Sequence, residues 1–202
     1  MAQQVWNLKR KILGNVLPGI LCVPSLIAGL LLFKIEDPFA QVPLGLMFIS
    51  PVVGWFCVNV MGLYDNSTMR SEIGRKLDRE LGAESRRQFF VGYSNPKFRS
   101  IWDPHEFVGF LIIEPDKWTL FGESEKLEIL TKDILGISWK KNTHSAMLLG
   151  GFMKVDFRDA AGVKTLLIES REKNSLLANK KVTRSLVKEF SQQLAQKNDA
   201  GL

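Results

Sequence analysis

The sequence predicts two transmembrane helices followed by a mainly β barrel that carries a C-terminal α-helix. Three observations support this fold class. The first 64 residues contain two long stretches without a charged side chain, and the chain after Tyr64 is as charged as a water-soluble domain. In that second part the apolar periodicity changes from helical to strand-like near Arg87 and becomes helical again near Asn179. We therefore expect a transmembrane hairpin at 1–64, a linker helix at 65–84 and a β domain at 85–198.

The two uncharged stretches, 12–33 and 42–63, are each 22 residues long. A bilayer core of about 30 Å needs roughly 20 apolar helical residues, so both are long enough to span it. A cleaved signal peptide is the alternative for the first stretch. It is longer than a typical signal core, however, and no small-residue cleavage site follows it.

Basic residues flank the hairpin on one side. Lys9, Arg10 and Lys11 precede the first stretch, six arginines and lysines follow the second between 70 and 87, and only Lys34 lies between the two stretches. Basic flanks stay in the cytoplasm. We expect an integral membrane protein of a bacterial inner membrane, with both termini and the β domain cytoplasmic.

Small residues at four-residue spacing occur in both stretches, as Ser25 with Gly29 and Ser50 with Gly54. Such pairs let two helix backbones approach closely. They could face each other within the hairpin or dock on another membrane protein. Neither stretch contains an ionisable residue, which favours an anchor over a transport pathway.

The linker has an apolar stripe with a four-residue repeat, formed by Met69, Ile73, Leu77 and Leu81. This pattern predicts an amphipathic helix. The helix could lie on the membrane surface, continue the second span as a stalk, or pack on the β domain.

Seven short apolar runs separated by turn residues predict seven strands, and one amphipathic stripe predicts a final helix. The strands are expected at 88–93, 107–113, 118–122, 127–130, 134–140, 147–157 and 163–169, and the helix at 179–196. The stripe of the helix comprises Val182, Leu186, Val187, Phe190 and Leu194. Such a stripe has to be buried, most simply across one end of the barrel.

This order of elements, together with the run VGFLIIEPDKWTLFGESEKLEILTKDILGISWKK, resembles the pleckstrin homology-like superfold and its bacterial, GRAM-type branches. The resemblance covers roughly 87–196. It implies binding of lipid headgroups, peptides or other subunits, and it does not imply catalysis.

Lipid-binding members of that superfold often carry a basic residue, a gap and then a basic-x-basic motif around the first strand pair. Arg87, Lys97 and Arg99 match this pattern in part, and Phe98 and Trp102 lie in the same loop. Cations there could meet phosphate while the aromatic rings lie at the interface. The alternative is a solvated loop whose aromatic rings pack on the barrel.

The sequence offers no catalytic residue, metal site or cofactor motif that outweighs a structural explanation. His105 and His144, the only histidines, are interpreted as loop residues, and Gly150-Gly151 as a bulge or a close backbone approach. A membrane-embedded enzyme would have only Asp65, His105 and Glu106 to draw on. The net charge of +6 is too diffuse to indicate nucleic acid.

The leading hypothesis is therefore a non-enzymatic, membrane-anchored scaffold or assembly subunit. Its partners would be membrane lipids and another membrane protein or complex, docked at the cytoplasmic face. The alternative hypothesis is a sensor of anionic lipid that uses the loop of Lys97 and Arg99.

Overall fold

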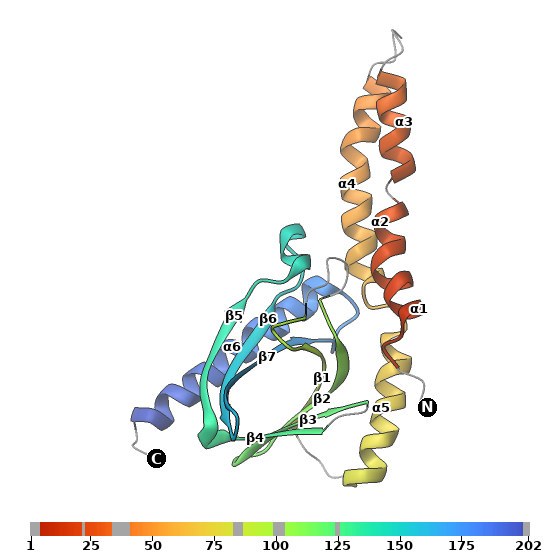
Figure 1. The fold of residues 1–202 in the computed structure, drawn as a ribbon. Helices are drawn as coiled ribbons and strands as arrows, with labels where there is room; N and C mark the ends of the chain where they lie inside the picture. Colours follow the sequence, from red (N-terminus) through yellow and green to blue (C-terminus); the bar gives the residue numbers. More distant parts are fainter. Residues whose placement is uncertain are drawn as a thin grey trace.

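The fold is described from a computed structural model that covers residues 5–21, 23–33, 41–82, 87–98, 104–123 and 126–199. Figure 1 shows a tall helical hairpin above a curled β-sheet, with one long helix crossing behind the sheet. The N-terminal segment and the sheet lie at the same end of the hairpin.

The hairpin pairs four short helical segments with one long helix. The short segments are α1 (Leu8–Lys11), the π-helical turn η1 (Ile12–Val16), α2 (Leu17–Leu21) and α3 (Val23–Phe33). They run antiparallel to α4 (Gln41–Met61). The π turn directly precedes Pro18, whose ring nitrogen cannot donate the usual helical hydrogen bond. Pro51, in contrast, is accommodated inside a continuous α4.

The structure corrects the expectation of two transmembrane helices. Within the residues that the structure describes, one helical run, Leu44–Leu81, is long and apolar enough to cross a membrane. Within the described residues, the first uncharged stretch begins with the π-helical turn η1 and continues as α2 to Leu21 and as α3 from Val23, and Cys22 lies outside the described residues. A count of uncharged residues does not predict the π-helical turn Ile12–Val16, which interrupts the α-helical geometry of this stretch.

The linker helix α5 (Asn66–Leu81) packs on the sheet. Its side chains Met69, Ile73 and Leu77 are buried in a cluster with Phe90 and Phe110 of the sheet's outer face. Of the three placements open from the sequence, the structure thus has packing on the β domain. Gly82 follows the helix with a positive φ of 76°, which suits a residue without a Cβ.

Seven antiparallel strands form one sheet in the order β4-β3-β2-β1-β7-β6-β5. The strands are β1 (Arg87–Ser94), β2 (Phe107–Ile113), β3 (Lys117–Gly122), β4 (Lys126–Leu130), β5 (Ile134–Lys140), β6 (Phe152–Asp159) and β7 (Gly162–Ser170), and α6 (Leu176–Asp199) follows them. The prediction of seven strands and one final helix is confirmed. The prediction of a closed barrel is wrong, because β4 and β5 are the two edges of the sheet and do not pair.

The residues beside the opening between β4 and β5 suit unpaired edge strands. The 3-10 turn η2 (Thr131–Asp133) joins β4 to β5 and turns the chain between them. On β4 the charged side chains of Lys126 and Glu128 are exposed and form an ion pair with each other. Charged edge strands resist further pairing. Strand alternation in a sequence specifies neighbours along the chain and does not specify whether the first and last strands of a curled sheet meet.

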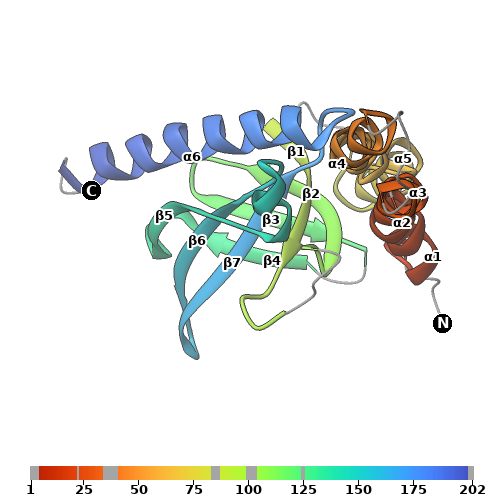
Figure 2. The same ribbon diagram turned by 90° about the horizontal axis from the view of Figure 1, so that it is seen from above.

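The main core lies inside the curl of the sheet and is covered at one end by α6. The stripe predicted for this helix faces the core, where the Phe190 ring lies 4.7 Å from the Trp118 ring. Arg87 at the start of β1 donates two hydrogen bonds to Glu189 of α6 and stacks over Phe190. These contacts attach α6 to the sheet, and Figure 2 shows the helix lying along one side of the curl.

One predicted strand begins too early. Residues 147–151 are not strand but complete a loop that contains the 3-10 turn η3 (Thr143–Met147). Gly150 and Gly151 lie in this loop with positive φ values of 59° and 142°. A Cβ on Gly151 would lie 2.0 Å from the Trp139 ring, so the close backbone approach predicted for this pair is present.

Candidate functional site

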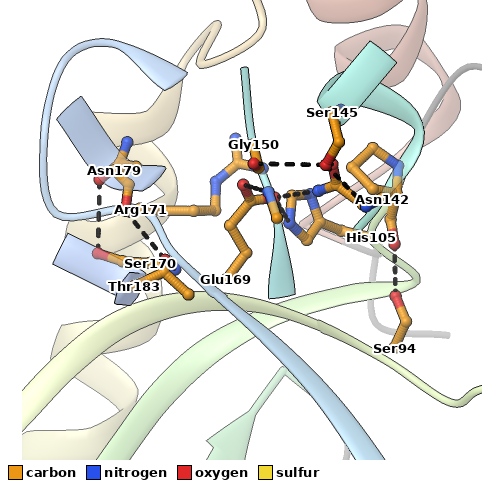
Figure 3. Close-up of polar contacts among 12 residues, drawn as sticks. Ser94, His105, Asn142, Ser145, Gly150, Glu169, Ser170, Arg171, Asn179 and Thr183 are labelled. Atoms are coloured by element: carbon orange, nitrogen blue, oxygen red, sulfur yellow. Dashed lines mark hydrogen bonds and ion pairs between the residues drawn. The ribbon is translucent and has the colours of Figure 1, made fainter. Parts of the chain in front are cut away.

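A cluster of polar side chains, four of them buried and two of them partly buried, lies where the foot of the hairpin meets the sheet domain, and Figure 3 shows most of its members. We call it the junction cluster. It consists of Asn66, His105, Asn142, His144, Glu169 and Arg171, which come from α5, the segment before β2, the loop 142–151 and the end of β7. Polar groups this deep have to find partners inside the protein.

Glu169 is the centre of the junction cluster and is 1% exposed. Its Oε1 accepts a hydrogen bond from the Gly151 backbone N–H at 2.8 Å. Its Oε2 accepts one from Asn142 Nδ2 at 2.9 Å and lies 3.0 Å from His105 Nε2. One carboxyl group therefore joins both ends of the loop 142–151 to the segment before β2.

Burial controls the protonation of this cluster. It raises the pKa of Glu169 to about 7, and contacts with His144, Gly151 and Arg171 offset only part of that shift. Burial lowers the pKa of His144 to about 4. Attraction to Glu169 offsets only part of this lowering of the pKa, and Nδ1 of His144 has no hydrogen-bond partner among the described residues. His144 is therefore neutral at physiological pH.

His105 occupies a space that a neighbouring glycine leaves. A Cβ on Gly92 of β1 would lie 2.3 Å from His105 Cδ2. The backbone next to the ring is fixed as well, because Ser94 Oγ donates to the Pro104 carbonyl at 2.7 Å. His105 O accepts a hydrogen bond from Trp6 Nε1, which ties the N-terminal segment to the same point.

Arg171 connects the cluster to the hairpin. Its Nε donates to Asn66 Oδ1 at 2.8 Å, and its carbonyl accepts from Asn66 Nδ2 at 2.7 Å. Its guanidinium lies 4.6 Å from the Trp6 ring centre. A further contact comes from α4, where Asn59 Oδ1 accepts the backbone N–H of Leu177 in α6. The sheet domain is thus fixed to the foot of the hairpin at several points.

The cluster has catalytic residue types but not an accessible geometry. Glu169 and His105 are 1% and 2% exposed, so a substrate does not reach them in this conformation. In the described part of the chain, no three His, Cys, Asp or Glu side chains are grouped as a metal site. The arrangement supports a rigid connection between two parts of the protein.

A cavity of about 670 Å³ opens at the end of the sheet opposite α6. We call it the mouth cavity. Its apolar lining comes from the inner face of the sheet, and its rim comes from the loop after β1 and the hairpin of β6 and β7. The lining residues are Tyr93, Phe107, Leu120, Leu127, Phe157, Val163 and Leu166, with Asn95, Pro96, Lys97, Glu106, Lys164 and Thr165.

Two of the lipid-binding candidates from the sequence, Arg87 and Lys97, lie far apart in the structure. Arg87 and Lys97 lie at opposite ends of β1, whose seven steps from Arg87 to Ser94 span about 23 Å. Arg87 is already paired with Glu189, whereas Lys97 lies at the rim of the mouth cavity. Phe98 lies beside Lys11 of the N-terminal segment. Arg99 and Trp102 lie outside the described residues.

The small residues proposed for helix packing lie inside the hairpin where they are described. Gly29, Ser50 and Gly54 are buried between α3 and α4, although both helices carry exposed apolar side chains elsewhere. The side chain of Ser25 lies outside the described part.

The sequence did not reveal the junction cluster. His105 and His144 do lie in loops, as interpreted, but both are buried, and the sequence indicated no role for Glu169 or Arg171. Glu169 is the polar residue that follows the apolar run of the last predicted strand, and Asn66 is of a residue type that commonly caps a helix. The one available signal is the Gly150-Gly151 pair, whose N–H at Gly151 binds Glu169.

Comparisons with known proteins found no match for this chain. No protein-family model matches the chain, and no curated protein matches it.

Proposed function

We propose that this protein is a membrane-anchored, non-enzymatic scaffold or assembly subunit that holds a binding domain at the cytoplasmic face of a membrane. The order of seven antiparallel strands and one final helix is consistent with the binding domains of the pleckstrin homology-like superfold, which the sequence resembles. The observation that carries the proposal is the mouth cavity, an apolar recess at the end of the sheet that α6 leaves uncovered.

The surface of α4 supports the membrane part of the proposal. Large apolar side chains are exposed along it, namely Val42, Leu44, Phe48, Ile49, Val52, Val53, Phe56 and Val60. Phe48 alone is 76% exposed. Water-soluble surfaces rarely present so continuous an apolar face. Lipid is the environment that such a helix suits, with the basic residues Lys9–Lys11 below it at the cytoplasmic side.

The junction cluster supports the scaffold part. A domain on a flexible tether would need few contacts with its anchor, whereas here Arg171, Asn66 and Trp6 form a buried connection. A fixed domain presents the mouth cavity in one orientation relative to the membrane. This suits the docking of a segment of a partner protein in a defined geometry.

The experiment compares native masses of the full chain purified in mild detergent from its own membranes. Val163 is 67% exposed at the cavity rim, and Leu135 is 45% exposed on β5, away from the cavity lining. We expect the wild type and the Leu135→Asp variant to purify with a partner, and the Val163→Asp variant to purify without it. A wild type that purifies alone, or a Val163→Asp variant that keeps its partner, would contradict the proposal.

The alternative function, sensing of anionic lipid, retains support from Lys97 at the cavity rim. It predicts that the purified full chain binds a short-chain anionic phospholipid, that Lys97→Glu weakens this binding, and that Lys132→Glu, on the turn η2, does not.

A further inference from the structure

The loop 142–151 is the part of the sheet domain that reaches furthest along the hairpin. In Figure 1 its 3-10 turn η3, between β5 and β6, stands beside the lower part of α4. Trp55 Nε1 of α4 donates a 2.8 Å hydrogen bond to the Met147 carbonyl. Leu149 of the loop is fully buried against Val58 of α4 and Leu176 of α6. The loop is therefore attached to the side of the proposed anchor.

The tip of this loop is apolar and exposed. Leu148 is 72% exposed and Met147 is 38% exposed. Leu148 also has a φ of 60°, a left-handed conformation that a bulky residue without a polar side chain rarely adopts. Backbone strain of this kind persists where the surroundings impose it, often at a functional site. Here the strain keeps a large apolar side chain directed outwards.

The loop is held rigidly in this position. Asn142 and Ser145 form a reciprocal capping box at the start of η3. Glu169 binds both ends of the loop, through Asn142 Nδ2 and the Gly151 N–H. Lys180 Nζ donates to the Leu148 carbonyl from α6. The tip is thus preorganised and does not need to fold when it meets a partner.

The position of the tip along α4 indicates that it meets the membrane. Trp55 lies six residues before Met61, the last residue of α4, which corresponds to about 9 Å along the helix. Gly14, just after the basic segment Lys9–Lys11, packs at the Met61 carbonyl. If the uncharged α4 enters the bilayer near Met61, the tip lies in the headgroup and upper acyl region. Tryptophan favours this region, and amphipathic surfaces enter it to about 5–10 Å.

We propose that the tip formed by Met147 and Leu148 inserts into the interfacial region of the cytoplasmic leaflet beside α4, as a second membrane contact of the sheet domain. This inference rests on the membrane anchorage of the proposed function. The exposed lysines Lys140 and Lys141 lie at the base of the loop, where they can meet anionic headgroups. Two contacts with one bilayer, the anchor and the tip, fix the orientation of the mouth cavity.

The test measures lipid contact at three sites in the purified full chain. Cys22 and Cys57 are first replaced by serine, and single cysteines are introduced as Leu148→Cys, Phe48→Cys and Val163→Cys. Each is labelled with an environment-sensitive fluorophore in nanodiscs that contain phosphatidylcholine and phosphatidylglycerol. Lipids with a nitroxide at a shallow or a deep acyl position then report contact and depth by quenching.

We expect the label at 148 to show blue-shifted emission and to be quenched more by the shallow nitroxide than by the deep one. The label at 48 should be quenched by nitroxide lipids whether or not the tip inserts. The label at 163 should respond only to a water-soluble quencher. A label at 148 that behaves like the one at 163 would overturn the inference, and lipid quenching at 48 would then show that the anchor itself stands. A label at 148 that is shielded from the water-soluble quencher in native membranes but not in nanodiscs would show that the tip contacts a partner protein. That result would also overturn the inference.

Discussion

Glu169 Oε2 lies 3.0 Å from His105 Nε2, across the boundary between the end of β7 and the segment that precedes β2. Both side chains are almost fully buried. The contact holds together three chain segments that are distant in sequence, because the same carboxyl group also binds Asn142 and Gly151. It links the loop 142–151 to the end of β7 and to the segment before β2.

Removal of this carboxyl should destabilise the protein strongly. Glu169→Ala leaves the Gly151 N–H and Asn142 Nδ2 without their acceptor, and each orphaned donor typically costs about 1–3 kcal/mol. We expect a loss of about 3 kcal/mol or more in the free energy of unfolding, measured by urea denaturation of the full chain in detergent. Glu80→Ala, on the exposed face of α5, serves as the control variant. A change below about 0.5 kcal/mol for Glu169→Ala, the range of ordinary surface substitutions, would contradict the account.

The pH dependence of stability should change in a defined direction when Glu169 is replaced by glutamine. The pKa of Glu169 is raised from 4.5 to about 7 on folding. Its contribution to stability is therefore present below pH 4.5 and is lost as the pH rises through 7. His144 opposes this trend. Its pKa is lowered from 6.5 to about 4, so its contribution is present above pH 6.5 and is lost as the pH falls through 4.

The two contributions partly cancel in the wild type between pH 4.5 and 6.5. We expect the unfolding free energy of Glu169→Gln, relative to the wild type, to rise as the pH increases from 4.5 to 7. His144→Gln should show the opposite slope relative to the wild type. Unfolding curves at four pH values across this window measure both slopes, and parallel curves for all three proteins would refute the protonation states assigned to the junction cluster.

The link between the hairpin and the sheet domain should depend on Asn66. Its side chain makes two hydrogen bonds to Arg171, whereas Ser67, the next residue of α5, is exposed. We expect Asn66→Ala to broaden the distribution of distances between spin labels introduced as Val60→Cys on α4 and Val163→Cys on β7. Ser67→Ala should leave the distribution unchanged. Equal, narrow distributions in all variants would show that Asn66 does not hold the two parts together.

The C-terminal helix should be indispensable to the sheet domain. Phe190 is buried against Trp118, and truncation of a buried phenylalanine typically costs about 3–5 kcal/mol. We expect Phe190→Ala to lower the thermal midpoint of the full chain markedly, while Gln192→Ala, on the exposed face of α6, leaves it unchanged. An unchanged midpoint for Phe190→Ala would mean that the helix is reserved for a partner and does not cover the core.

These residues also show what the sequence could and could not predict. The stripe from Val182 to Leu194 and the alternation in β1 to β7 are local patterns, and they predicted the final helix and the seven strands. Sheet closure depends on whether β4 and β5 meet in space, and no local pattern encodes that. The π-helical turn Ile12–Val16 was not predicted, because a count of uncharged residues does not distinguish a π turn from an α-helix.

The candidate site was harder to predict for the same reason. Glu169, His105 and Asn142 are far apart in sequence, and each has a common local explanation at its own position. Only the curl of the sheet brings them together at the foot of the hairpin. Arg87 and Lys97 show the opposite case, because they are near in sequence and are separated by the length of β1.

The most direct test of the account asks where the sheet domain lies relative to a membrane. A Val163→Cys variant in a background with Cys22→Ser and Cys57→Ser carries one exposed thiol on β7. A membrane-impermeant maleimide is applied to intact spheroplasts and to inside-out membrane vesicles. The account predicts that the protein remains with the membranes and is labelled only in the inside-out vesicles. Labelling in intact spheroplasts, or recovery of the protein in the soluble fraction after lysis, would contradict the proposal that the hairpin holds the sheet domain at the cytoplasmic face.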